Sequence, residues 1–143
     1  MAIIVKHLEF TSSFLTGHAV IDIDHRQLIT YLNKINSCFP EKLGREAKEN
    51  CTALMLLMDG HMDREETILR DAEYPRLSEH ADSHIRLAEN CRQVLAGCNN
   101  ACLRNQDDKC TTALTVAIVE HIVGKDLYFK SFQQAEGLAD NVD

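Results

Sequence analysis

Two pairs of potential metal ligands lie close together near the middle of the chain. His61 and Glu65 are four residues apart, and so are His80 and His84, on either side of a Tyr74-Pro75 step. Residues four apart in an α-helix lie one above the other on the same face. Each pair therefore presents two side chains of the kinds that bind transition metals to one point in space.

Three further candidate ligands flank these pairs. His25 lies upstream, and His121 and Asp126 lie downstream, each on the apolar face of a predicted helix. Five imidazoles and two carboxylates buried together would be very costly without a cation. They are enough for two metal ions and too many for one, so the sequence predicts a two-metal centre. Imidazole and carboxylate suit iron, but they do not by themselves exclude zinc, cobalt or manganese.

Apolar residues recur at helical spacing in four segments, with no strand-like alternation between them. Four amphipathic helices joined by short connections predict an all-α protein, an up-down-up-down four-helix bundle. We expect one domain over residues 1–143, with an extended N-terminal arm at 1–20 packed across a bundle at about 21–136. The expected helices end at Pro40, run from about 43 to 72, begin at 76–78, and run from about 108 to Gly137.

One spacing departs from the regular helix. His121 and Asp126 are five residues apart, which would turn them about 140° from each other on an α-helix. Both can reach one metal pair if the helix widens locally into a π-type turn, and Gly124 between them could ease the distortion. We therefore expect an irregular turn over residues 121–126.

Charge and cysteine content narrow the classes of partner and the compartment. A net charge of −7 argues against nucleic acid or an anionic membrane surface as the main partner. The apolar run at 3–5 is too short for a signal peptide or a membrane span, so we expect a cytoplasmic protein.

Cys91, Cys98 and Cys102 could share one helix face as a thiolate site or redox pair. Without a Cys-x-x-Cys motif, we favour reduced cysteines that act as small apolar fillers.

These motifs resemble those of the hemerythrin family, specifically its bacterial branch, over nearly the whole chain. The segments that carry the resemblance are Gly17 with Ile21-Asp22-Ile23-Asp24-His25, His61-x-x-x-Glu65-Glu66, Tyr74-Pro75 followed by His80-x-x-x-His84, and His121-Ile122-x-x-x-Asp126. The resemblance implies a non-haem di-iron centre with an oxo or hydroxo bridge, bridged also by Glu65 and Asp126. One iron would take His80, His84 and His121. The other would take His25 and His61 and keep one position open, where dioxygen binds in the family.

The chain departs from the family's pattern in its aromatic residues. It has no tryptophan, with Phe10 and Ala117 at two places where the family commonly has one, and Met62 stands where phenylalanine is usual. By the resemblance, the dioxygen pocket is lined by Leu28, Met62, Ala117, Ile118 and Ile122. Our hypothesis is that the smaller side chains admit water and speed autoxidation of the oxygenated state. The alternative is that neighbouring side chains refill the space.

Several other polar residues have explanations that need no metal chemistry. We expect Asp22 and Asp24 to complement the dipole at the start of the first helix. Glu66 is expected at the surface, because the residue after Glu65 points in another direction. His7 and His18 are expected at the surface or behind the ligands, and Tyr74 is expected to pack at a turn.

Three functions are compatible with such a centre. We favour a dioxygen-binding protein for storage, delivery or scavenging, not an enzyme. The second is a dioxygen or redox sensor that acts on a downstream signalling domain or partner. The third, reduction of peroxide or nitric oxide, ranks lowest because the sequence offers no general acid beyond the ligands.

Overall fold

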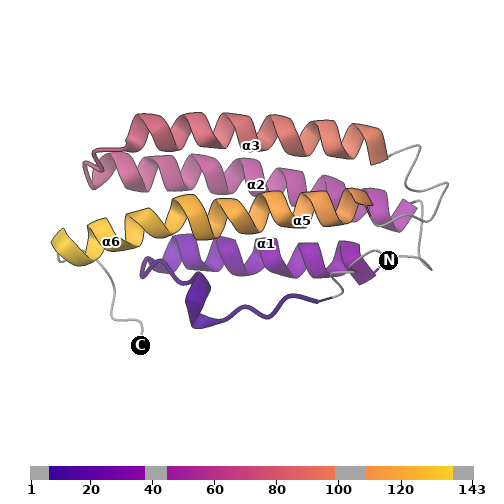
Figure 1. Cartoon of the computed structure of the whole chain (residues 1–143), viewed down its shortest axis with the longest axis horizontal. Coiled ribbons are helices and arrows are strands. Elements are labelled where there is room, and N and C mark those ends of the chain that lie inside the picture. Colours follow the sequence, from indigo (N-terminus) through magenta and orange to yellow (C-terminus); the bar gives the residue numbers. More distant parts are fainter. Residues whose placement is uncertain (1–6, 38–44, 99–108, 137–143) are drawn as a thin grey trace.

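A computed structural model of the chain describes residues 7–37, 45–98 and 109–136. Every regular element in these ranges is helical, and the long helical segments run side by side in alternating directions (Figure 1). The predicted all-α, up-down-up-down four-helix bundle is therefore confirmed. None of the helices in the described ranges combines the length and the apolar character needed to cross a membrane.

The predicted helix boundaries agree closely with the structure wherever it describes them. Four expected boundaries lie outside the described residues: the end of the first helix at Pro40, the start of the second at about 43, and the start and end of the fourth at about 108 and Gly137. The first helix begins at Ala19, so the N-terminal arm is two residues shorter than predicted. In chain order the elements are η1 (Ser12–Phe14), α1 (Ala19–Ser37), α2 (Arg45–Asp71), α3 (Leu77–Cys98), α5 (Lys109–His121), η2 (Ile122–Asp126) and α6 (Leu127–Glu136).

The apolar side chains form two clusters along the bundle. α1 packs on α2 and α5, and α3 also packs on α2 and α5, so the four helices enclose one interior. The larger cluster contains Leu28, Met58, Leu87 and Ile118, and the smaller one lies around Tyr74 near the α2–α3 turn. On each helix the predicted ligands fall between members of the two clusters. The ligands therefore form a polar layer across an otherwise apolar core.

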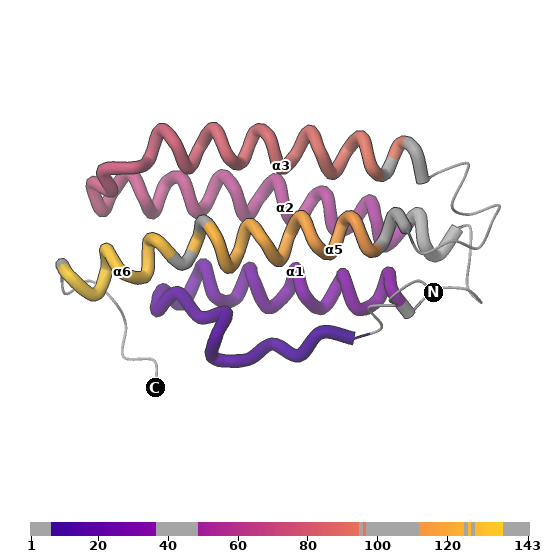
Figure 2. The backbone as a smooth tube through the Cα atoms, viewed as in Figure 1, coloured from indigo at the N-terminus to yellow at the C-terminus, as the bar shows by residue number. Residues whose placement is uncertain are grey.

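The N-terminal arm runs antiparallel to α1 and is fixed at both of its described ends (Figure 2). Asn33 on α1 exchanges two hydrogen bonds with the backbone of Leu8, at 2.7 and 2.9 Å. At the other end, the buried Asp22 carboxylate accepts hydrogen bonds from the backbone and hydroxyl of Thr16 and from the backbone of Gly17. Gly17 has φ 89°, a conformation that favours glycine. Gln133 of α6 donates to the Thr16 carbonyl at 2.9 Å, so the arm ties α1 to the last helix.

Candidate metal centre

The structure brings all seven predicted ligands together in the polar layer of the core. Every one of them is buried, with exposed fractions from 0% to 8%. Their donor atoms form two groups, within each of which all of the atoms lie within 4.8 Å of one another. Glu65 and Asp126 belong to both groups. One group adds His80, His84 and His121 to these carboxylates, and the other adds His25 and His61.

The two carboxylates lie between the groups and present one oxygen to each. Glu65 Oε1 contacts the Nε2 atoms of His80 and His84, the latter at 3.1 Å, whereas its Oε2 faces His61 Nε2 at 3.1 Å. Asp126 Oδ1 lies 2.9 Å from His80 Nε2, and its Oδ2 lies 2.7 Å from His25 Nε2. A carboxylate that turns one oxygen to each of two ligand groups has the arrangement of a bridging ligand.

Several of these inward-facing atoms lie within 3.1 Å of one another without the geometry of a hydrogen bond, and so have no hydrogen-bond partner. They are His61 Nε2, His121 Nε2, Glu65 Oε2 and Asp126 Oδ1, all of them buried. Buried polar atoms without partners are rare, because leaving one unsatisfied costs about 1–3 kcal/mol. Their convergence, together with a donor set of imidazoles and carboxylates, fits a site built to hold metal ions.

The protonation of the centre shows how the chain balances its charges when no metal is present. Burial and the nearby Asp126 would raise the pKa of Glu65, but hydrogen bonds from the surrounding imidazoles hold that pKa well below its ordinary value. Burial would lower the pKa of His25 and of His80, but their hydrogen bonds to Asp126 and Glu65 raise both pKa values to about 9. Metal-free protein therefore compensates its buried carboxylates with protons, which metal binding must displace.

The metal-free protein is expected to lose stability as the pH rises through about 9. His25 and His80 have pKa values of about 9 when folded and 6.5 as the reference, so their stabilisation is complete below pH 6.5 and disappears above about 9. For one such group this amounts to about 3 kcal/mol, or roughly 6–12 °C in the midpoint of thermal unfolding. Circular dichroism melts between pH 6 and 10 measure it. Metal-loaded protein serves as the control and should show little change, and a metal-free midpoint constant over this range would contradict the prediction.

The irregular turn expected between His121 and Asp126 is confirmed. Residues Ile122–Asp126 form a π-helix, η2, which continues directly into α6. The wider turn lets both ligands face the same interior. A Cβ atom at Gly124 would meet nothing within 4 Å, so the glycine is not required there by lack of space.

Two carboxylates that the sequence analysis assigned elsewhere contact ligand imidazoles. Asp24 Oδ2 lies 3.1 Å from His61 Nδ1. Because α1 begins at Ala19, Asp22 lies in its first turn and Asp24 does not, so the expectation that Asp24 complements the helix dipole was wrong. Glu66 Oε2 lies 2.9 Å from His84 Nδ1, and its side chain is only 27% exposed. The expectation of a surface acid was therefore wrong. Glu66 does point away from Glu65, but this direction leads to His84 of α3, in the surface groove between α2 and α3.

The residues assigned to the dioxygen pocket do not all lie in the same surroundings. Leu28, Ile118 and Ile122 are buried in the larger apolar cluster. Met62 is also buried in it, but it lines a surface groove of about 370 Å³ between α2 and α3. Ala117 is half-buried and lines a second groove, of about 340 Å³, beside His121 on α5.

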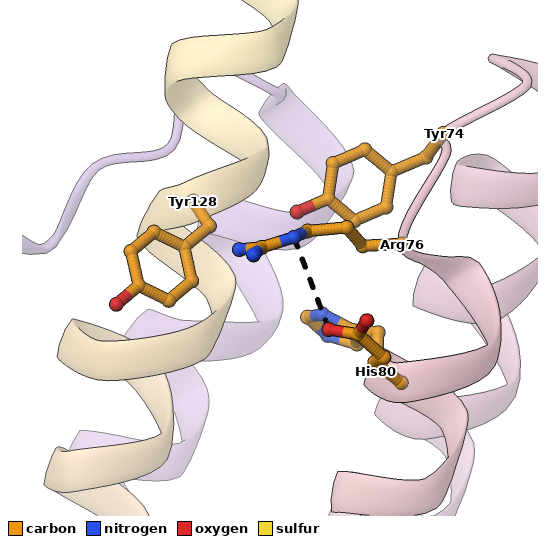
Figure 3. Close-up of a pocket in the computed structure, with 5 residues that line it drawn as sticks. Tyr74, Arg76, His80 and Tyr128 are labelled. Atoms are coloured by element: carbon orange, nitrogen blue, oxygen red, sulfur yellow. Dashed lines mark ion pairs between the residues drawn. The ribbon is translucent and has the colours of Figure 1, made fainter.

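A small pocket lies over His80 at the end of the bundle near the α2–α3 turn. Figure 3 shows Arg76 extending toward Tyr128 of α6, with Tyr74 on one side and His80 on the other. The Arg76 guanidinium lies 5.6 Å from the centre of the Tyr128 ring, and Glu79 pairs with Arg76 at 3.8 Å. The pocket holds about 30 Å³, the room of one water molecule.

Tyr74 packs at this turn as predicted. Its ring is buried edge-on against Phe129 and Phe132, with ring centres 5.4 and 5.2 Å away. Burial raises the pKa of its hydroxyl, which keeps the phenol neutral. His7 and His18 lie outside both ligand groups; His7 pairs with Glu9 at 3.7 Å, and His18 is half-buried.

Cys91 is a reduced, fully buried member of the larger apolar cluster. Burial raises the pKa of its thiol to about 11, which fits the interpretation of an apolar filler. The side chains of Cys98 and Cys102 lie outside the described part of the structure.

Fold and site together define a class of protein: a four-helix bundle that buries a histidine-rich, carboxylate-bridged metal-binding cluster. A family model described as hemerythrin HHE cation binding domain matches residues 16–131. The chain belongs to the hemerythrin family. Among curated proteins, no match to this chain was found.

Proposed function

We propose that the protein binds dioxygen reversibly at a di-iron centre held by the seven converging ligands. Membership of the hemerythrin family and the two donor groups support this function. The observation that carries it is the unequal number of imidazoles. Both groups share Glu65 and Asp126, but one adds three histidines and the other adds only His25 and His61. If both iron ions had the same coordination number, the one held by fewer histidines would have one position left for a small ligand.

The chain's own residues would control what reaches that position. Two iron ions bridged by an oxo or hydroxo group would supply the electrons that reversible dioxygen binding requires. The imidazoles would hold the metal ions from four helical segments, and the two carboxylates would each contribute to both positions. Leu28, Ile118 and Ile122 are buried close to the ligand layer and would exclude water from the bound gas. The pocket residues carry no proton donor, which disfavours peroxide or nitric-oxide reduction.

A sensor is the second candidate, and the connection between η2 and α6 favours it. His121 ends α5, Asp126 ends the π-helix, and α6 begins at the next residue. A change of ligation at Asp126 would act directly on the last helix, and through Gln133 on the N-terminal arm. A downstream signalling domain or partner would then read that movement. The cytoplasmic location remains a prediction from the sequence.

The test is an optical spectrum of anaerobically iron-loaded protein, recorded before oxygen is added, after it is added, and after it is removed. Charge-transfer bands that appear with oxygen and vanish without it are expected, at two iron ions per chain. Bands that settle into a spectrum unresponsive to oxygen removal would overturn reversible binding and favour the sensor. An excess of added peroxide that is consumed rapidly would favour the enzyme.

A further inference from the structure

In each ligand group, one imidazole is held from behind by a carboxylate. His61 contacts Asp24 through Nδ1 at 3.1 Å, and His84 contacts Glu66 through Nδ1 at 2.9 Å. In both rings Nε2 faces the ligand cluster, so Nδ1 carries the hydrogen and donates it to the carboxylate. Such hydrogen bonds fix the orientation of the ring and increase its basicity as a ligand.

The two carboxylates differ in their compensating charge. Asp24 accepts two hydrogen bonds from the Arg64 guanidinium, from Nε at 2.9 Å and from Nη2 at 2.8 Å. Its Oδ2 atom serves Arg64 and His61 at once. Glu66, in contrast, makes no ion pair with a lysine or arginine among the described residues. The nearby arginine in its groove, Arg92, pairs with Asp59 at 3.1 Å.

A glycine one turn earlier lies beside the Arg64 guanidinium. A Cβ atom added at Gly60 would lie 3.0 Å from Arg64 Nη1, closer than most real Cβ contacts. The lack of a side chain at this glycine leaves room for the guanidinium to fold back along α2 to Asp24. The neutralised pair on the His61 side is therefore built into the packing of α1 and α2.

We propose that Asp24, paired with Arg64, and Glu66 are positioning residues that give the two metal positions unequal affinities. The uncompensated charge of Glu66 strengthens His84 as a ligand. Arg64 neutralises Asp24, so Asp24 does not strengthen His61 as a ligand in the same way. Arg64 also places a positive charge on the His61 side of the centre. The position with three histidines fills first, and the one with His25 and His61 fills second. This inference rests on the two-metal part of the proposed function and not on dioxygen binding.

The position with three histidines has one more imidazole than the other, and this alone would also make it fill first. The test therefore compares variants with the wild-type protein. Metal-free protein is titrated with Co²⁺ without oxygen, and cobalt absorption and calorimetry resolve the two binding steps. Glu66→Gln keeps a hydrogen-bond acceptor but removes the charge, and it is expected to weaken the first step about 10–100-fold. Asp24→Asn is expected to weaken the second step by a similar factor. Arg64→Gln is expected to strengthen the second step, because it leaves Asp24 uncompensated.

Asp71→Asn is the matched control, since this exposed acid at the end of α2 lies outside both ligand groups. It should change neither step. Helical circular dichroism of each metal-free variant verifies folding, and Glu66→Asp provides a second variant if Glu66→Gln does not fold. Equal weakening of both steps by Glu66→Gln and by Asp24→Asn would overturn the inference while leaving two-metal binding intact. Wild-type protein that binds fewer than two Co²⁺ would overturn both.

Discussion

Glu65→Gln is expected to reduce the metal content of the protein from two ions per chain to at most one. Glu65 is 1% exposed and presents one oxygen to each ligand group. An amide has one oxygen and no charge, so it cannot bridge two cations in the same way. The four positive charges of two ferrous ions would then have Asp126 as their one remaining carboxylate ligand, beside the proposed oxo or hydroxo bridge. We expect an affinity loss greater than the roughly 10–100-fold typical of residues behind the ligands.

Elemental analysis after anaerobic iron loading and desalting measures this change. Glu89→Gln is the matched control, because it makes the same chemical change at an exposed position of α3 that lies outside both ligand groups. It should retain two ions under saturating iron. Two ions retained by Glu65→Gln would show that this carboxylate does not bridge, and the assignment of both groups would need revision.

The seven ligands could be predicted from the sequence because each helix carries its own part of the pattern. His61 and Glu65 share a face through their spacing of four, and so do His80 and His84. The spacing of five between His121 and Asp126 could only be reconciled with one metal pair by a wider turn, and η2 is that turn. The helix starts followed from proline and from apolar periodicity, which are also local signals.

The supporting residues could not be predicted in this way. Asp24 directly precedes the ligand His25, and Glu66 directly follows the ligand Glu65. The imidazole that each carboxylate contacts lies on another helix. Periodicity gives the face on which a side chain lies, but it does not give the rotation of one helix against the next. The one available signal for these supporting residues was an acidic residue next to a ligand in the sequence, with no partner assigned to it. The same limit applies to Gly60, because periodicity does not show that the nearest side chain to it is Arg64 of its own helix.

The arm illustrates a second limit. Its lack of periodicity predicted an extended segment, yet its position depends on single polar contacts that have no repeating pattern. Asn33 holds the backbone of Leu8, Asp22 holds Thr16, and Gln133 reaches Thr16 from residues more than a hundred positions later. Such contacts depend on the completed bundle, because three of its elements must already lie side by side.

Ala117→Trp is expected to slow autoxidation of the oxygenated protein about tenfold, which corresponds to about 1.4 kcal/mol in the barrier. Ala117 lines the groove of about 340 Å³ beside His121, so the surrounding side chains have not closed this space over the ligand. An indole there would cover the imidazole edge and exclude water from the α3–α5 side of the centre. The decay of the oxygen-dependent absorption bands in air gives the rate directly.

Val116→Trp tests whether the effect belongs to the groove. Val116 is the adjacent residue on α5 and is 46% exposed, so an indole at this position faces outward and should leave the decay rate unchanged. Equal rates for wild type and Ala117→Trp would place the route of water elsewhere. The groove beside Met62 and His84 would then be the next candidate, because it also reaches a ligand imidazole from the surface. A tenfold effect confined to Ala117→Trp would instead mean that a single small residue on the three-histidine side limits how long bound oxygen survives.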